Sequence, residues 1–158
     1  MLRIITVPNK ILRQRSAEID RDFLLSSETG KLIKEMIETM YVGDGIGLAA
    51  PQIGKNIRIC VIGKEAHPEK LKNTVLINPT WQKTSRKYAT EVEGCLSIPK
   101  TWGKVKRWKN IHLEAYDVEF NPLSFDANGY FARVIQHEVD HLDGILFIDK
   151  AKGVYMTE

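Results

Sequence analysis

The feature that most constrains this chain is the pentapeptide HEVDH, which lies near the end of a segment with helical periodicity. In "ANGYFARVIQHEVDHLDG" (127–144), Asn128 stands where a helix cap is expected and Gly144 where the helix should stop. At about 100° per residue, the two histidines and the glutamate point inward, together with an apolar set: Phe131, Val134, Ile135 and Leu142. The other side is expected to face solvent and holds Ala132, Arg133, Gln136, Asp140 and Asp143.

Two imidazoles and a carboxylate on a buried helix face need partners, because burying them unsatisfied is costly. His137 and His141 are four residues apart, so their rings stand one above the other and can bind one divalent ion. Glu138 lies beside them, within reach of a metal-bound water. The sequence therefore favours a metal-binding helix; the alternative is a chance match in which the histidines are ordinary buried or surface residues.

Two histidines leave a catalytic metal one protein ligand short of the usual three. The zincin metallopeptidases supply the third ligand downstream, but "LDGILFIDKAKGVYMTE" has no histidine and only a terminal glutamate, which leaves its aspartates as alternatives. Cys95 in "EGCLSIP" follows a predicted strand and a glycine, and a thiolate is a strong ligand. Cys60, between Ile59 and Val61, is expected to be a buried core residue. Cys95 as a Cys/His nucleophile is less favoured, since that chemistry needs one histidine rather than two.

The rest of the chain predicts one α+β domain over residues 1–158, since we find no linker or internal repeat. "KLIKEMIETMY" (31–41) has helical spacing, with a serine upstream that can cap it. "NIRICVIG", "TVLINPTW" and "NIHLEAYDVEF" alternate apolar and polar residues, as antiparallel strands do. No membrane span or signal peptide is expected, and two cysteines are too few for a disulfide scaffold, so the sequence indicates a cytoplasmic protein.

The net charge of +3 is too small to imply nucleic-acid binding. The lysines of "KTWGKVKRWK" (100–109) alternate with bulky residues, which is typical of a solvated strand face. We therefore expect no specific contact between this stretch and nucleic acid; the alternative is a contact with ribosomal RNA through this patch.

A glycine-rich stretch, "GDGIGLAAPQIG" (43–54), fits the spacing G-x-G-x-x-A of dinucleotide-binding loops. Its context does not fit, because it follows a helix and reaches Pro51 where a dinucleotide loop would open one. We expect the glycines instead to let the backbone approach a substrate closely, with the Gln52 side chain as a hydrogen-bond donor.

Taken together, "GIGLAAPQ", "EGCLS" and "HEVDH" resemble the motifs G-x-G-x-A-A-x-Q, E-G-C-x-S and H-E-x-D-H of the peptide deformylase family, in the same order. The "LINP" strand and the "QHEVDHLDGILFID" ending extend the similarity over almost the whole chain. The resemblance implies an α+β fold with small antiparallel sheets around the metal helix. It also implies a hydrolase that removes the formyl group from the N-terminal formyl-methionine of nascent polypeptides.

By position, the resemblance implies that Cys95, His137 and His141 hold the metal, with water or hydroxide as the fourth ligand. Glu138 would act as general base and then general acid. The oxyanion would be met by the Gln52 side chain, the Leu96 backbone N–H and the metal. The remaining implied residues align the substrate (Gly47 and Gly94), lie by the methionine pocket (Ile46, Tyr130 and Val134) or support the ligands (Glu93 and Arg107).

Two arguments about the identity of the metal ion give different answers. Tetrahedral His₂Cys with one open site suggests Zn²⁺, whereas the resemblance implies Fe²⁺, for which Ni²⁺, Co²⁺ or Zn²⁺ can substitute, and we favour Fe²⁺. The resemblance also implies the ribosome as a partner, although relatives often dock with a C-terminal helix and this chain ends at Glu158. Other departures are Trp108, where many members have proline, and the turn "DVEFNPLS". Two alternatives remain: a zinc peptidase of another class, and a non-catalytic peptide binder.

Overall fold

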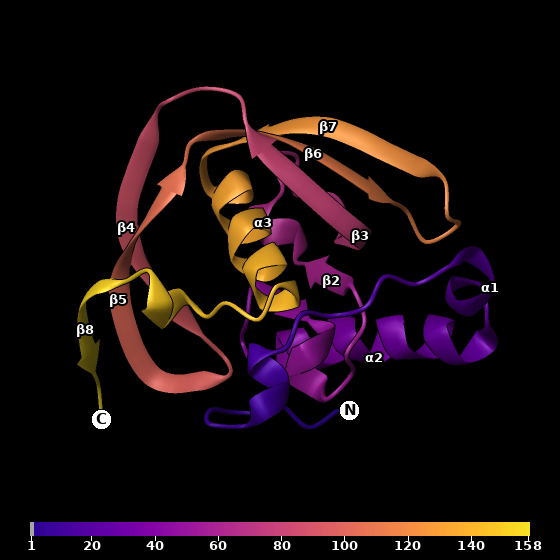
Figure 1. The fold of residues 1–158 in the computed structure, drawn as a ribbon, viewed down its shortest axis with the longest axis horizontal. Helices are drawn as coiled ribbons and strands as arrows, with labels where there is room; N and C mark the ends of the chain where they lie inside the picture. The colour runs from indigo at the N-terminus through magenta and orange to yellow at the C-terminus, as the bar shows by residue number, and fades with distance from the viewer. Residues whose placement is uncertain (1) are drawn as a thin grey trace.

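The computed structural model describes residues 2–158, so Met1, the first residue of the expected domain, lies outside the described part. Within that part, helix α3 (Gly129–Leu142) lies between two antiparallel sheets (Figure 1). The larger sheet has the order β1-β2-β3-β6-β7, with strands Gly47–Ala49, Ile59–Ile62, Thr74–Lys83, Asn110–Tyr116 and Pro122–Asn128. The smaller has the order β4-β5-β8, with strands Tyr88–Cys95, Ile98–Trp108 and Lys152–Met156. The α+β prediction is confirmed.

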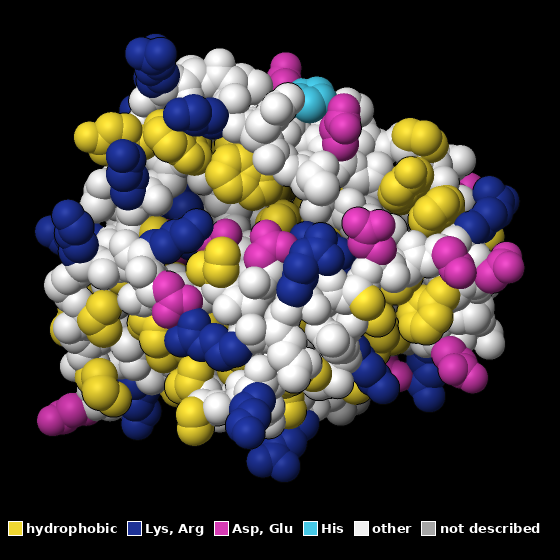
Figure 2. Space-filling view, viewed as in Figure 1, with side chains coloured by type: hydrophobic (Ala, Val, Ile, Leu, Met, Phe, Trp, Pro, Cys, Tyr) yellow, Lys and Arg dark blue, Asp and Glu magenta, His cyan; other side chains and the backbone are white. Residues whose placement is uncertain are grey.

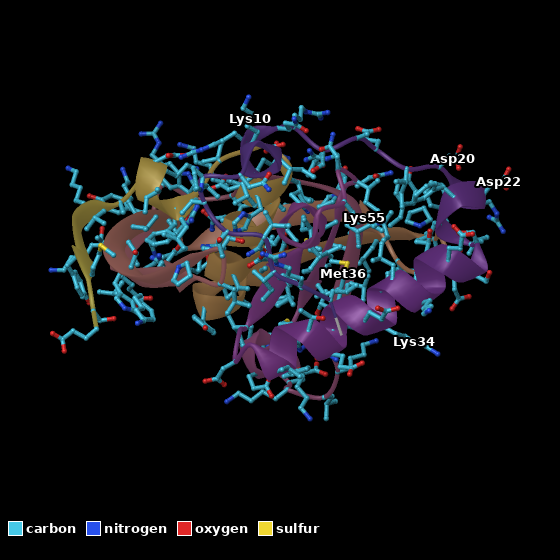
Figure 3. The ribbon with its side chains drawn as sticks, turned by 90° about the horizontal axis from the view of Figure 1, so that it is seen from below. Lys10, Asp20, Asp22, Lys34, Met36 and Lys55 are labelled. Carbon is cyan, nitrogen blue, oxygen red and sulfur yellow. The ribbon has the colours of Figure 1, made fainter. Side chains whose placement is uncertain are left out.

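Short helices and α2 complete the described fold. They are α1 (Arg21–Leu24), α2 (Ser27–Val42) and the 3-10 turns η1 (Lys10–Arg13), η2 (Ala50–Ile53), η3 (Lys64–Ala66) and η4 (Phe147–Asp149). Helix α2 confirms the predicted helix and is longer at both ends. It begins after Ser26, which caps it by accepting a hydrogen bond from the Thr29 N–H. Its Met36 points into the molecule and its Lys34 points out (Figure 3). None of the described helices is long and apolar enough to cross a membrane.

Strand β2 differs from the alternation expected of it, because all four of its residues are buried. Cys60 and Ile62 belong to a hydrophobic cluster with α3, whereas Ile59 and Val61 belong to a cluster with α2. A strand with a core on each face has no side left for polar residues. The expectation that Cys60 is a core residue is confirmed, since it is fully buried.

Helix α3 confirms the helix predicted around HEVDH, with one correction. Gly144 follows its C-terminus with φ +75°, and Asn128 occupies the N-cap position, although its side chain makes no capping hydrogen bond. The prediction of a solvated side was wrong for Ala132, Arg133, Gln136 and Asp140, which are all buried, and holds only for Asp143. Both sheets pack against this helix, so its polar side chains find their partners inside the protein.

Candidate active site

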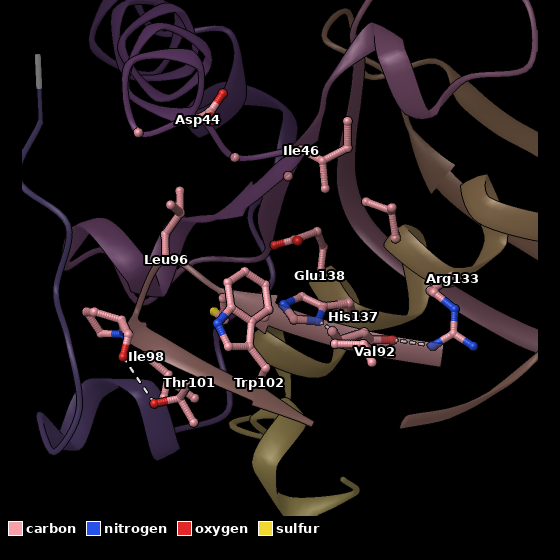
Figure 4. Close-up of a pocket in the computed structure, with 18 of the residues that line it drawn as sticks. Asp44, Ile46, Val92, Leu96, Ile98, Thr101, Trp102, Arg133, His137 and Glu138 are labelled. Carbon is pink, nitrogen blue, oxygen red and sulfur yellow. Dashed lines mark hydrogen bonds and ion pairs between the residues drawn. The ribbon is translucent and has the colours of Figure 1, made fainter. Parts of the chain in front are cut away.

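A cavity of about 600 Å³ opens where the loop after α2, the β4–β5 hairpin and helix α3 meet (Figure 4). Most of the residues singled out from the sequence line it: Ile46, Gly47, Gln52, Glu93, Gly94, Cys95, Leu96, Tyr130, Val134, His137 and Glu138. His141 and Arg107 lie outside the lining and are buried. Three stretches distant in the chain thus converge on one cavity.

The three residues expected to bind metal lie close together. The ligand atoms of Cys95, His137 and His141 are all within 4.8 Å of one another, and the Cys95 sulfur lies 3.2 Å from the His141 Nε2. Helix α3 provides the two imidazoles from successive turns, and the end of β4 brings the thiol to them. This group could hold one metal ion.

A carboxylate on β4 orients the first histidine. Glu93 Oε1 lies 2.8 Å from the His137 Nδ1, which leaves the Nε2 of that ring for a ligand bond. Burial would raise the pKa of Glu93, but hydrogen bonds from His137 and Arg107 outweigh it and hold that pKa far below its usual range. Glu93 is therefore a fixed negative charge behind the imidazole.

The charge on Glu93 is balanced by a buried network. Arg107 on β5 donates to both oxygens of Glu93 at 2.9 Å and to Asp140 at 2.6 Å, and Lys150 reaches Asp140 at 3.0 Å. Arg133 on α3 donates to Glu93 at 2.6 Å and to the Val105 and Ala89 carbonyls. The network fastens α3 to the smaller sheet directly behind the histidine.

Sequence reasoning missed Arg133 and Asp140 as members of this site by assigning them to solvent. Opposite charges seven residues apart share a helix face, and that spacing could have indicated that both belong to one buried network, in which Arg133 pairs with Glu93 and Asp140 with Arg107. Trp102 was also missed. It lines the cavity, and its ring lies so close to Gly94 that a side chain at position 94 would collide with it.

Glu138 is 3% exposed, and its Oε1 has no hydrogen-bond partner among the described residues. Burial is the largest influence on this carboxyl and, with the nearby charge of Glu93, raises the pKa of Glu138 to about 7. Gly47 on β1 lies against its other oxygen, since a Cβ at position 47 would be 2.5 Å from the Glu138 Oε2. The carboxylate therefore occupies space that only a glycine leaves free.

The side chain of Gln52 bridges the glycine-rich loop and the β4–β5 hairpin. Its Oε1 accepts from the Ala49 N–H at 2.9 Å, and its Nε2 donates to Ser97 Oγ at 3.1 Å and lies 3.5 Å from the Cys95 sulfur. These contacts point the amide N–H groups toward the thiol. Leu96 lies next to that thiol and packs over the loop, because a Cβ at Gly45 would be 2.7 Å from its Cδ1.

The far end of α3 is held by residues that the sequence did not single out. The Leu142 carbonyl accepts hydrogen bonds from the Arg58 Nη1 at 2.9 Å and from the Ser16 N–H at 2.8 Å. Arg58 also lies 3.0 Å from Asp143. A cation at the C-terminus of a helix is favourable for its dipole, and here it fixes the turn that carries His141.

The donor set fits a divalent cation. One sulfur and two imidazole nitrogens are ligands that Zn²⁺ and other first-row metals accept. Burial would lower the pKa of His137, but hydrogen bonds with Cys95 and Glu93 raise it well above its usual value, so the surroundings of this ring attract positive charge. Burial and the charge of His137 lower the pKa of His141, which favours the neutral imidazole that binds metals.

Comparison with known proteins identifies the family. The family model for polypeptide deformylase matches residues 1–155. The chain belongs to the peptide deformylase family. It is 40% identical over 152 residues to peptide deformylase 2 of Gloeobacter violaceus, covering 96% of this chain and 80% of that one. It is 37% identical over 155 residues to the peptide deformylase of Desulforudis audaxviator, covering 98% and 96%.

Solved structures of peptide deformylases have the same fold. The enzyme from Synechococcus elongatus in complex with actinonin superposes with a TM-score of 0.88 at 38% identity, covering 96% of this chain and 81% of that one. A Met-Ala-Ser-bound enzyme of class I type b from Acinetobacter baumannii gives a TM-score of 0.89 at 29% identity, covering 95% and 98%. The resemblance stated from the motifs is confirmed, and these matches favour it over a zinc peptidase of another class.

Proposed function

We propose that this chain is a metal-dependent deformylase that hydrolyses the N-formyl group of peptides beginning with formyl-methionine and releases formate. Membership of the peptide deformylase family supports the activity. The observation that carries the proposal is the convergence of one thiol, two imidazoles and a buried glutamate at one cavity. We further propose that residues 1–158 act as one catalytic domain.

The proposed metal ligands are Cys95, His137 and His141. A divalent ion held there would supply Lewis acidity toward the attacking water and the formyl oxygen. Glu138 removes a proton from that water through a carboxylate oxygen and delivers it to the leaving amine nitrogen. The Gln52 Nε2 and the Leu96 N–H donate hydrogen bonds to the formyl oxygen as negative charge develops on it. Without the unpartnered oxygen of Glu138, the site would bind peptides but would not transfer the proton.

The substrate is positioned by the cavity walls. We propose that Gly47 and Gly94 let the peptide backbone approach closely, and that Ile46, Tyr130 and Val134 contact the methionine side chain. All five line the cavity, and Val134 is buried whereas Tyr130 is 53% exposed, which gives the pocket an apolar base and a partly open rim. A bound Met-Ala-Ser in the Acinetobacter baumannii relative supports a peptide of this kind as the ligand.

We propose Fe²⁺ as the native ion, with Ni²⁺, Co²⁺ or Zn²⁺ as substitutes. The thiolate in the donor set supports a first-row transition metal and disfavours Mg²⁺ or Ca²⁺, which prefer oxygen ligands. We also propose that the enzyme works in the cytoplasm at the ribosome, since that is where formylated N-termini emerge.

The test measures formate released from formyl-Met-Ala-Ser by anaerobically purified protein loaded with Fe²⁺ or Ni²⁺, with the bound metal quantified in the same sample. We expect turnover by the native chain. We expect Glu138→Gln to retain the metal and lose at least about 10²-fold in kcat, since positioned acid–base groups contribute that much. No formate from metal-loaded native protein would refute the proposed function, and loss of metal in Glu138→Gln would make Glu138 a structural group.

A further inference from the structure

Six exposed basic side chains gather outside the cavity, on strand β5 and on the segments that flank the β4–β5 hairpin. We call this set the basic face: Lys83, Arg86, Lys87, Lys104, Lys106 and Lys109. Figure 2 shows Lys and Arg side chains collected along the upper left edge of the molecule, over the strands β4 and β5 of Figure 1. The sequence pattern 100–109 contained only half of this set, so its extent is a result of the fold.

Pairing between distant segments creates the basic face. The Lys109 N–H donates to the Lys87 carbonyl at 3.0 Å, which joins the turn before β4 to the end of β5. In the β4–β5 ladder, Tyr88 lies opposite Trp108, and Lys106 lies on the same face of β5 as Trp108, two residues away. Lys104 and Lys106 therefore lie on β5 and Lys83 at the end of β3, whereas Arg86, Lys87 and Lys109 lie in the adjoining turns.

Two of the lysines are held in place by aromatic rings. The Lys83 Nζ lies 4.1 Å from the centre of the Trp108 ring, and the Lys106 Nζ lies 4.0 Å from the Tyr88 ring and 5.3 Å from the Trp108 ring. A cation over an aromatic face is attracted by the ring but keeps its full charge. These contacts fix the ammonium groups and reduce the entropy they would lose on binding an anion.

The basic face lacks neutralising carboxylates. Within residues 2–158, none of its six side chains forms an ion pair with an acidic group. The acidic residues of the same hairpin, Glu91 and Glu93, pair instead with Arg133 and Arg107 on the opposite side. Since the chain has a net charge of only +3, the remainder of the molecule is negative on balance. The unpaired cations of this face would attract a polyanion.

We propose that the basic face binds the phosphate backbone of structured RNA. This inference rests on the proposed function, in which the enzyme acts on nascent peptides as they emerge beside the RNA of the ribosome. A cluster of cations, two of them held against aromatic rings, can contact the successive phosphates of an RNA helix. A membrane is a weaker match, because the rings of Tyr88 and Trp108 each have a lysine ammonium group against them, which disfavours their insertion into lipid. The contact is to the backbone, so it agrees with the expectation of no sequence-specific binding.

The test measures the affinity of the metal-loaded chain for a fluorescent RNA stem-loop over a range of salt concentrations. The variant replaces Lys104, Lys106 and Lys109 with glutamine, and the control replaces three other exposed lysines, Lys10, Lys34 and Lys55, which are labelled in Figure 3. Both variants have the same net charge. At about 0.9 per phosphate contact, the slope of log K against log salt should fall by about 2 to 3 in the first variant and remain in the control. Its affinity at 0.1 M salt should fall by at least about tenfold.

Deformylation of formyl-Met-Ala-Ser should be unchanged in both variants, because none of the replaced side chains lines the cavity. This readout separates failure of the RNA contact from failure of the proposed function. If the first variant does not fold, Arg86→Gln with Lys87→Gln carries the same prediction, with a slope change of about 2. Equal loss of affinity in the test and control variants would overturn the proposal, as would tighter binding to anionic lipid vesicles than to RNA.

Discussion

Replacing Gly47 with alanine tests whether the position of Glu138 governs activity. The new Cβ would lie 2.5 Å from Oε2, 2.8 Å from Cδ and 2.9 Å from Cγ of Glu138. Ordinary contact begins near 3.4 Å, so the carboxylate must move by about 0.9 Å. Gly47 cannot give way instead, because it is paired with Ile62 in the β1–β2 ladder. A displacement near 1 Å can cost about 10²-fold in rate.

We therefore expect Gly47→Ala to lose about 10²-fold in kcat/KM for formyl-Met-Ala-Ser while its metal content stays at the native level. The three atoms nearest the new methyl all belong to Glu138, so the metal ligands are not displaced. Gly30→Ala is the matched control, because a Cβ there meets nothing within 4 Å. It should keep full activity and gain up to about 1 kcal/mol of stability, as glycine is unfavourable within a helix. Activity of Gly47→Ala within twofold of the native enzyme would refute the reasoning.

The remaining predictions concern the ligands and their surroundings. Cys95→Ala should lose metal on dialysis, whereas Cys60→Ala should retain it and lose only about 1 kcal/mol of stability; equal metal contents would contradict the proposed ligand set. Arg133→Met removes a partner of a buried carboxylate and should cost about 3 kcal/mol, seen as a fall in Tm of about 10 °C, and an unchanged Tm would show that the ion pair is dispensable. Gln52→Ala should lower kcat by about 10²-fold with little loss of metal, so a change confined to KM would contradict its proposed role.

The sequence predicted the helix of HEVDH and its two ends because these depend on local periodicity and on residues such as Gly144. The sequence also predicted that Cys95 lies close to the two histidines, because a catalytic metal needs a third protein ligand. The burial of Arg133 and Asp140 was not predictable in the same way. A helical wheel assigns one side to solvent by default, and only the packing of a second sheet against α3 removes that side.

The basic face shows the same limit at the surface. Alternation within 100–109 predicted exposed lysines correctly, and Lys104 and Lys106 are exposed. It could not show that the turn before β4 would lie beside them, because that proximity depends on strand pairing between residues about twenty positions apart.

Glu93 has two roles in this structure, one at the proposed metal site and one in the packing of α3. The same carboxylate sets the electron density of the His137 ring and neutralises the two guanidinium groups that attach α3 to the smaller sheet. A neutral residue in place of Glu93 would weaken the hydrogen bond to the His137 ring and would also leave uncompensated positive charge in the interior. Changes near the proposed metal site are consequently less costly on the side of the thiol, where Ser97 accepts a hydrogen bond from Gln52 and takes no part in the ion pairs that hold the helix.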